Sequence, residues 1–240
     1  MFLRNRAAVF GVILFLAVLL MTLFGPMFYS NDASDIVARP VLSPGSDGAP
    51  PLGTDYLGRD VLAGVISGGR VSLLVAAMAA LMVVFIGVTI GAVSGYYGGW
   101  VDTVLMRIVD LQLSFPTILV ALILLVILGR GVDKIIVALV VVQWAYFART
   151  VRGVALVEGS RDYVEAARGL RLRPLRILFF HILPNCLPTI LVVATIQMAQ
   201  AISLEATLSF LGLGLPPTRP SLGLLIANGF DYLQSGRWWI

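Results

Sequence analysis

Charged residues, cysteine, histidine and lysine are all scarce in this chain of 240 residues. Only 12% of the residues are charged, against roughly a quarter in soluble domains, and 59% are hydrophobic. So small a fraction of charged residues excludes an ordinary soluble enzyme, a disordered chain and a nucleic-acid-binding protein as the main interpretation. Cys186 and His181 are single residues of their types, so we expect no intrachain disulfide and no Cys/His metal site. A mean hydropathy of +0.95 leaves a multi-spanning membrane protein.

Motifs for catalysis and nucleotide binding are also missing from the sequence. There is no G-x-x-x-x-G-K-[ST] loop, and the single lysine is Lys134, so the chain cannot hold a nucleotide by itself. The glycine-rich stretch 95–99 follows an apolar run and no strand, which favours a helix end over a phosphate loop. Neither H-E-x-x-H nor G-x-S-x-G occurs. We therefore expect a protein that is not an enzyme, with no catalytic residues, no cofactor and no metal.

Five apolar runs are long enough, or nearly so, to cross a hydrocarbon core of about 30 Å. They predict an all-α, polytopic transmembrane helical bundle. Polar segments separate the runs, and we expect a short amphipathic piece at 96–112 and a polar tail at 212–240. The predicted spans are Ala7–Phe24, Val71–Gly95, Leu113–Gly129, Ile135–Phe147 and Cys186–Ser203.

The distribution of arginine predicts the orientation of these spans. With the N-terminus inside, the inner segments hold ten basic residues against five acidic ones, and the outer segments hold seven against eight. Positive residues favour cytoplasmic loops, so the basic composition reflects topology and not a nucleic-acid-binding surface. Five spans then place the C-terminus outside. Because Trp238 and Trp239 are typical of a membrane interface, we expect a sixth span to be missing and the chain to be incomplete at its C-terminus.

Two features within the spans point to packing and to the transport pathway. Gly87, Gly91 and Gly95 repeat every four residues, which places them on one helix face and permits close helix contact. Glu205, at the outer end of the fifth predicted span, is the closest candidate for an ionisable residue within a span. We expect it to be a solvated carboxylate at the outer interface, with a role in the pathway or in gating as the alternative.

The cytoplasmic segment 149–185 carries the most specific local pattern. Asp162 and Glu165 form a D-x-x-E start that resembles a capping box, and Gly169 and Pro174 limit the helix that follows. A second helix is expected from Pro174 to about residue 180. Together they predict a short cationic helix–turn–helix whose small alanine face, at 166–167, lies against a partner protein.

This segment resembles the EAA loop of permease subunits of bacterial ABC importers. The resemblance begins with Glu165-Ala166-Ala167 and Leu183-Pro184 and extends over essentially the whole chain. The further stretches resemble the C-type permeases for dipeptides, oligopeptides and nickel. They are Leu52–Leu62, Gly69–Leu73, Gly95–Asp102 with Met106, Arg107 and Asp110, His181–Asn185, and Glu205–Gly214.

The resemblance implies a type I ABC importer-like permease in a bacterial inner membrane. It implies half of a translocation pore, a second homologous permease subunit, two ATP-binding cassette ATPase subunits and an extracytoplasmic solute-binding protein. Peptide is the favoured substrate, and nickel or another small solute stays open. The family usually has glycine where this chain has Arg171, so Gly169 is expected to supply the turn. The implied ATPase-coupling residues are Glu165, Ala166, Ala167, Arg168, Gly169, Arg171 and Arg176.

The expected domains are a first transmembrane helix (1–28), an extracytoplasmic segment (29–70) and a permease domain (71–240) with its coupling loop at about 149–185. The rival interpretation is an ATP-independent carrier or a membrane scaffold. It predicts paired ionisable residues within spans or inverted repeats, and the sequence has neither. An intramembrane enzyme is less favoured still, because no catalytic pair is present.

Overall fold

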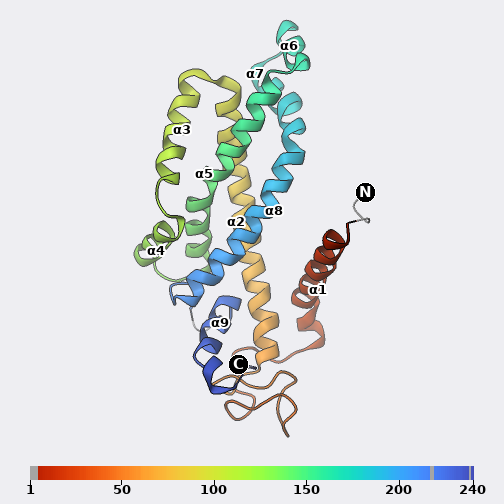
Figure 1. The fold of residues 1–240 in the computed structure, drawn as a ribbon, viewed down its shortest axis with the longest axis vertical. Helices are drawn as coiled ribbons and strands as arrows, with labels where there is room; N and C mark the ends of the chain where they lie inside the picture. The colour runs from red at the N-terminus through yellow and green to blue at the C-terminus, as the bar shows by residue number, and fades with distance from the viewer. Residues whose placement is uncertain (1–4, 217–218, 238) are drawn as a thin grey trace. The chain divides into compact units, whose positions relative to one another are not determined.

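A computed structural model describes residues 5–216, 219–237 and 239–240, so Arg4 and Trp238 lie outside the described residues. The regular structure of the described residues is helical apart from two isolated β-bridges. The chain divides into two compact units, Met1–Leu74 with Glu205–Ile240, and Val75–Leu204. In chain order (Figure 1), the elements are α1 (Arg6–Phe28), α2 (Val61–Tyr97), α3 (Gly99–Leu113), α4 (Thr117–Leu128), α5 (Val132–Gly159), α6 (Asp162–Gly169), α7 (Pro174–Ile177), the π-helix η2 (Leu178–Ile182), α8 (Leu183–Phe210), α9 (Leu222–Phe230) and the 3-10 helix η3 (Leu233–Ser235).

The predicted all-helical, polytopic fold is confirmed. Four helical segments in the described residues are long and apolar enough to cross a membrane: α1, α2, α5 and the continuous segment Pro174–Phe210. The pair α3 and α4 passes the same test jointly but is bent by 85° at its break, which gives up to five spans. The predicted third span therefore corresponds to α4 and the turn before it, and the amphipathic piece expected at 96–112 is the helix α3.

In the first unit, α1 packs against the beginning of α2 through small residues. Thr22 is buried, and a Cβ atom added to Gly69 would lie 2.7 Å from its methyl carbon. The side chain of Asn5 accepts hydrogen bonds from the first free backbone N–H groups and so caps α1. The helix continues to Phe28 although Pro26 lies inside it, so the predicted end at Phe24 is wrong by one turn.

The segment between α1 and α2 is organised around Asp60, which is 1% exposed. Its Oδ1 accepts hydrogen bonds from the backbone N–H groups of Leu62 (2.9 Å) and Ala63 (3.3 Å), so it caps α2. Its Oδ2 accepts from Asn31 (2.8 Å) and from the hydroxyl of Tyr29, which follows α1 directly. The second helix consequently begins at residue 61, ten residues before the predicted span.

The C-terminal part of the first unit is more helical than the polar tail that the sequence suggested. Residues 222–230 form α9, and Ser221 caps it by accepting a hydrogen bond from the N–H of Leu224 (3.2 Å). The helix approaches α8 closely, because a Cβ atom added to Gly223 would lie 2.8 Å from the Cα of Ala206. The prediction of a polar tail at 212–240 did not include α9, because a helix of nine residues is too short to be recognised as a span.

In the second unit, α2 and α5 run parallel and in close contact (Figure 1). The three predicted packing glycines all face α5. A Cβ atom added to any of them would come closer than real Cβ atoms approach their neighbours, so only glycine fits without a shift. The distances from the added atom at Gly87, Gly91 and Gly95 to the Cβ atoms of Phe147, Val151 and Ala155, respectively, are each 2.8 Å.

Two ion pairs join α3 to α5 in the same unit. Arg152 donates from Nε and Nη2 to the two carboxylate oxygens of Asp102 (2.6 and 2.5 Å), and Ser94 on α2 donates to the same carboxylate (2.5 Å). Arg149 pairs with Asp110. The two hydrogen bonds between Arg152 and Asp102 fix the orientation of both side chains. These ion pairs therefore hold α3 against α5.

The segment 149–185 is more helical than predicted. The fourth span was expected to end near Phe147, yet α5 continues twelve residues further, about 18 Å of helix. The second helix of the predicted helix–turn–helix does not stop before Pro184. It passes through the π-turn η2 into α8, where Asn185 donates to the carbonyl oxygen of His181 (2.6 Å). A widened turn of this kind accommodates a proline that lacks an N–H.

Candidate coupling site

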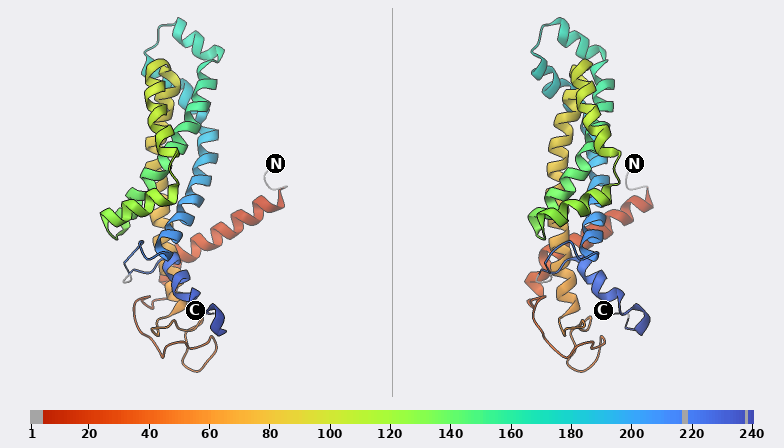
Figure 2. Two further views of the ribbon diagram at one scale, coloured as in Figure 1. Left: turned by 60° about the vertical axis from the view of Figure 1, so that its left-hand side comes forward. Right: turned by 90° about the vertical axis from the view of Figure 1, so that its left-hand side faces the viewer.

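The extension of α5 carries α6 to one end of the second unit, where α2 also finishes (Figures 1 and 2). The helix begins at Asp162 as predicted, but the capping box does not form. Its N-cap is Arg161, which makes no side-chain cap hydrogen bond. Asp162 and Glu165 lie within the first turn, where negative charge interacts favourably with the helix dipole.

The two faces of α6 differ in burial. Val164 and Ala167 are 0% and 4% exposed, so they pack against the rest of the unit. Glu165, Ala166 and Arg168 are exposed. The expectation that both alanines face a partner is therefore wrong for Ala167, because its position three residues after Val164 places it on the inner face.

Tyr163 attaches α6 to the two helices that flank it in the chain. Its hydroxyl donates to Oε2 of Glu158 on α5 (2.8 Å), and the side chain of Asn185 on α8 also hydrogen bonds to it. Burial, the hydrogen bond to Glu158 and the charge of that carboxylate raise the pKa of Tyr163 to about 12. The sequence interpretation missed Tyr163, because its partner lies across the turn at a spacing that no helical pattern reveals.

Arg168 joins α6 to the end of α2. Its guanidinium carbon lies 5.5 Å from the ring centroid of Tyr96, within the range of a cation–π interaction. The same side chain remains largely exposed, so its charge is still presented to the surface. With the Tyr163 contacts, α6 is fixed to α2, α5 and α8 of its unit.

The turn after α6 is formed by Arg171 and not by Gly169. Arg171 has φ = +53°, in the left-handed region, whereas Gly169 is the last residue of the helix. The N–H of Leu172 donates to the carbonyl oxygen of Ala167 (3.2 Å) and that of Arg171 to Arg168 (2.9 Å), which is the Schellman pattern. Arg171 therefore takes the conformation for which glycine is favoured, and the expected role of Gly169 is corrected.

Arg171 and Arg176 do not share the outward face of α6. Both line an open groove of about 600 Å³ in the α6–α7 turn and the beginning of the last long helix. The predicted coupling set thus divides in the structure. One part is the exposed face of α6, with Glu165, Ala166 and Arg168, and the other is this groove.

Glu205 lies in the first unit, near the end of α8, and is fully buried. Its carboxylate accepts hydrogen bonds from Ser72 on α2 (2.8 Å) and from Ser209 one turn later on α8 (2.7 Å). The backbone N–H of Leu222 at the beginning of α9 lies 3.4 Å from the same Ser72 hydroxyl. The expectation of a solvated carboxylate is wrong, because two serine hydroxyls replace water as its partners.

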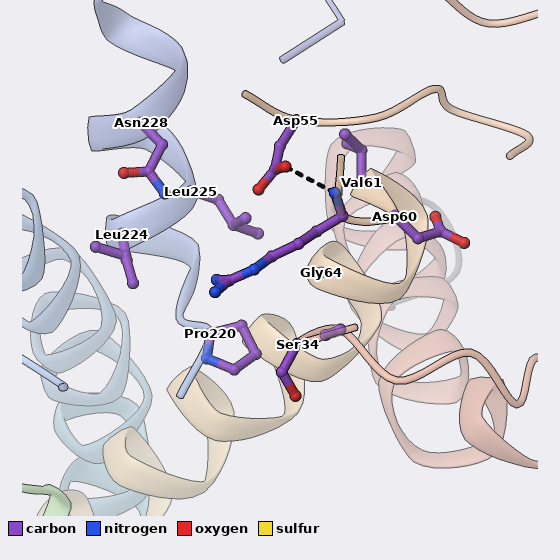
Figure 3. Close-up of a pocket in the computed structure, with 11 residues that line it drawn as sticks. Ser34, Asp55, Asp60, Val61, Gly64, Pro220, Leu224, Leu225 and Asn228 are labelled. Carbon is purple, nitrogen blue, oxygen red and sulfur yellow. Dashed lines mark hydrogen bonds between the residues drawn. The ribbon is translucent and has the colours of Figure 1, made fainter. Parts of the chain in front are cut away.

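A small cavity of about 30 Å³ also lies in the first unit (Figure 3). Asp55, Val61 and Gly64 line one side of it, and Leu224 and Asn228 of α9 line the other. This volume holds about two water molecules and no peptide. The cavity is consequently too small to be a substrate site.

Comparisons with known proteins identify the family of the chain. The family model described as binding-protein-dependent transport system inner membrane component matches residues 87–238, which is more than half of the chain. The chain belongs to this permease family. A second model, the N-terminal TM domain of oligopeptide transport permease C, matches residues 1–50.

Named relatives match the permease over nearly its whole length. The oligopeptide transport system permease protein OppC of Bacillus subtilis is 37% identical over 237 residues, covering 99% of this chain and 77% of the relative. The dipeptide transport system permease protein DppC of Bacillus subtilis is 37% identical over 241 residues, covering 98% and 73%. DppC of Haemophilus influenzae is 33% identical over 242 residues, covering 99% and 82%.

Family membership determines the general role of the chain. It is the transmembrane permease component of an ABC importer in the inner membrane, and in this family that component is non-catalytic and needs no cofactor of its own. A binding-protein-dependent system also implies a solute-binding protein and an ATPase as partners. The rival interpretation of an ATP-independent carrier or scaffold is thereby excluded.

Proposed function

We propose that this permease forms half of the translocation pore of a peptide importer. A second homologous permease subunit completes the pore, two ATPase subunits bind on the cytoplasmic side, and the binding protein delivers substrate outside. Support for peptide comes from the relatives, whose names specify oligopeptide and dipeptide transport. A nickel chelate or another small solute is the alternative that a substrate competition assay decides.

We propose further that the exposed face of α6 is the coupling surface for an ATPase subunit. Glu165, Ala166 and Arg168 present one negative charge, one small side chain and one positive charge on a single short helix, with Gly169 at its end. A small side chain between opposite charges permits close approach and two charge-assisted contacts. This arrangement of α6 is the observation that carries the proposal.

The contacts on the inner side of α6 make it a lever and not a loose loop. Tyr163 is bonded to α5 and α8, and Arg168 lies over Tyr96 at the end of α2. A displacement of α6 is therefore transmitted to three long helices of the second unit. When ATP closes the ATPase dimer, the pore changes state only if α6 interacts differently with the two ATPase conformations.

We assign Glu205 a gating role at the predicted outer end of α8. Its two hydrogen bonds connect α2 and α8 within the first unit, and the same Ser72 hydroxyl lies near the beginning of α9. A buried carboxylate without these donors is costly, so any opening that separates these helices must supply new partners for it. The domain division proposed for this function remains 1–28, 29–70 and 71–240, with the coupling segment at about 149–185.

The proposal is tested in the purified complex reconstituted into vesicles, by measuring peptide uptake and ATP hydrolysis together. Glu165→Arg reverses one charge of the coupling face and should lower uptake per ATP hydrolysed at least about tenfold. Asp47→Arg makes the same charge reversal at an exposed position between α1 and α2 and should leave this ratio unchanged. Undiminished uptake by a fully inserted Glu165→Arg complex would contradict the assignment.

A further inference from the structure

A groove at the α6–α7 turn combines positive charge with exposed apolar side chains. It has a volume of about 600 Å³ and is open to the surface. All of its lining residues come from a single stretch of ten. They are Arg171, Leu172, Arg173, Leu175, Arg176, Phe179 and Phe180.

The charge in this groove is unbalanced. Arg171, Arg173 and Arg176 are exposed, and none of them forms an ion pair within the described part of the chain. The described lining residues include no acidic side chain. Guanidinium groups bind phosphate through paired N–H donors, so three of them in one groove favour a phosphate-bearing occupant.

The apolar side chains continue from the charged ones into a membrane span. Leu175, Phe179 and Phe180 are 59%, 51% and 75% exposed. They belong to the segment Pro174–Phe210, whose length and composition allow it to cross a membrane. Along the chain the lining therefore changes from cationic to aromatic as the helix enters the bilayer, and a phospholipid changes in the same order from headgroup to acyl chain.

We propose that this groove binds an anionic phospholipid of the cytoplasmic leaflet. The headgroup phosphate contacts the three arginines, and an acyl chain lies against Phe179 and Phe180. The inference rests on the inner-membrane orientation of the proposed function, with α6 on the cytoplasmic side, and not on the identity of the transported solute. The proposed coupling face of α6 is formed by Glu165, Ala166 and Arg168, so the inference reassigns Arg171 and Arg176 from the ATPase to the lipid.

The test titrates the purified importer complex in mild detergent with phosphatidylglycerol, and the retained lipid is counted by native mass spectrometry. Arg173→Gln with Arg176→Gln should weaken phosphatidylglycerol binding at least about tenfold, because each removed charge near a membrane surface weakens anionic lipid binding severalfold. Arg171 is left intact because it forms the turn. Phosphatidylcholine should bind weakly to both proteins. Arg173→Lys with Arg176→Lys keeps the charge and should recover part of the binding.

The matched control is Arg39→Gln with Arg219→Gln, which removes two exposed arginines outside the groove and should leave lipid binding unchanged. Co-purification of the ATPase subunit is measured for each variant as well, so that a loss of assembly is distinguished from a loss of lipid binding. Equal affinity of the wild-type complex for phosphatidylglycerol and phosphatidylcholine would overturn the proposal without any variant. Unchanged phosphatidylglycerol binding with loss of the ATPase from Arg173→Gln/Arg176→Gln would assign the groove to the ATPase instead.

Discussion

Arg171 takes a backbone conformation that costs an L-amino acid about 1–2 kcal/mol and glycine almost nothing. The hydrogen bonds of the Schellman turn hold it there. We therefore expect Arg171→Gly to stabilise this turn by about 1 kcal/mol. Hydrogen exchange of the amides at 170–172 should slow by roughly fivefold.

The control for this prediction is Gly169→Ala, a change within the helix at a position with open space around it. It should stabilise α6 through helix propensity alone and leave the turn amides nearly unchanged. Faster exchange at 170–172 in Arg171→Gly would show that the arginine side chain, and not its backbone strain, determines the stability of the turn.

Tyr163 gives a prediction about pH. Its pKa is raised to about 12, so the folded state holds the phenolic proton more tightly than the unfolded state does. The stabilisation is present below the ordinary tyrosine pKa of about 10 and is lost as the pH rises toward about 12. The difference in phenolate absorbance between wild type and Tyr163→Phe should show a midpoint near 12. A midpoint near 10 would contradict both the burial of this phenol and its hydrogen bond to Glu158.

Residue types could be predicted better than their burial. The EAA triplet, the four-residue glycine repeat and Glu205 were all identified from the sequence. The exposure of Ala167 and Glu205 was predicted wrongly. Ala167 lies on the buried face of α6, and Glu205 accepts a hydrogen bond from Ser72, 133 positions away in the chain. Burial of this kind is set by helices distant in the chain, and a single sequence does not reveal which helices meet.

The stability of the second unit depends on the close contact between α2 and α5. A Cβ atom at Gly91 would lie 2.8 Å from the Cβ of Val151 and 2.9 Å from the backbone nitrogen of Arg152. Because backbone cannot move aside as a flexible side chain can, we expect Gly91→Ala to destabilise the unit by about 1–3 kcal/mol. The thermal unfolding midpoint of the purified complex should fall by a few degrees.

Gly153 provides the matched control for that change. It lies in α5 with nothing within 4 Å of the position of an added Cβ atom. Gly153→Ala should therefore leave the midpoint unchanged or raise it slightly through better helix propensity. Equal effects at the two glycines would show that α2 and α5 are not in close contact.

Helix existence was predictable at this scale, and helix ends were not. Hydropathy located the apolar part of α1, α2, α4, α5 and α8. It could not extend α5 beyond Phe147, because Arg149 and Arg152 look like loop residues until Asp110 and Asp102 of α3 are seen to pair with them. The first span was predicted to end at Phe24, although the helix continues past Pro26 to Phe28.

The whole molecule combines a membrane permease with a short helix, α6, that we propose couples it to the ATPase. Family membership follows from motifs spread along the chain and is supported by relatives that match 98–99% of it. The structure supports the proposed coupling, because contacts of Tyr163 and Arg168 join α6 to three long helices. Without those contacts a charged helix on the surface would transmit no motion to the pore.

The central claim is that the exposed face of α6 binds the ATPase subunit, and co-purification tests it most directly. The tagged chain is isolated with its partners in mild detergent as wild type, Glu165→Arg and Asp47→Arg, and the bound proteins are identified by mass. We expect the ATPase subunit to remain with wild type and Asp47→Arg and to fall at least about tenfold in Glu165→Arg, a loss of about 1.4 kcal/mol or more. Equal retention by Glu165→Arg and wild type would contradict the assignment of α6 as the coupling helix.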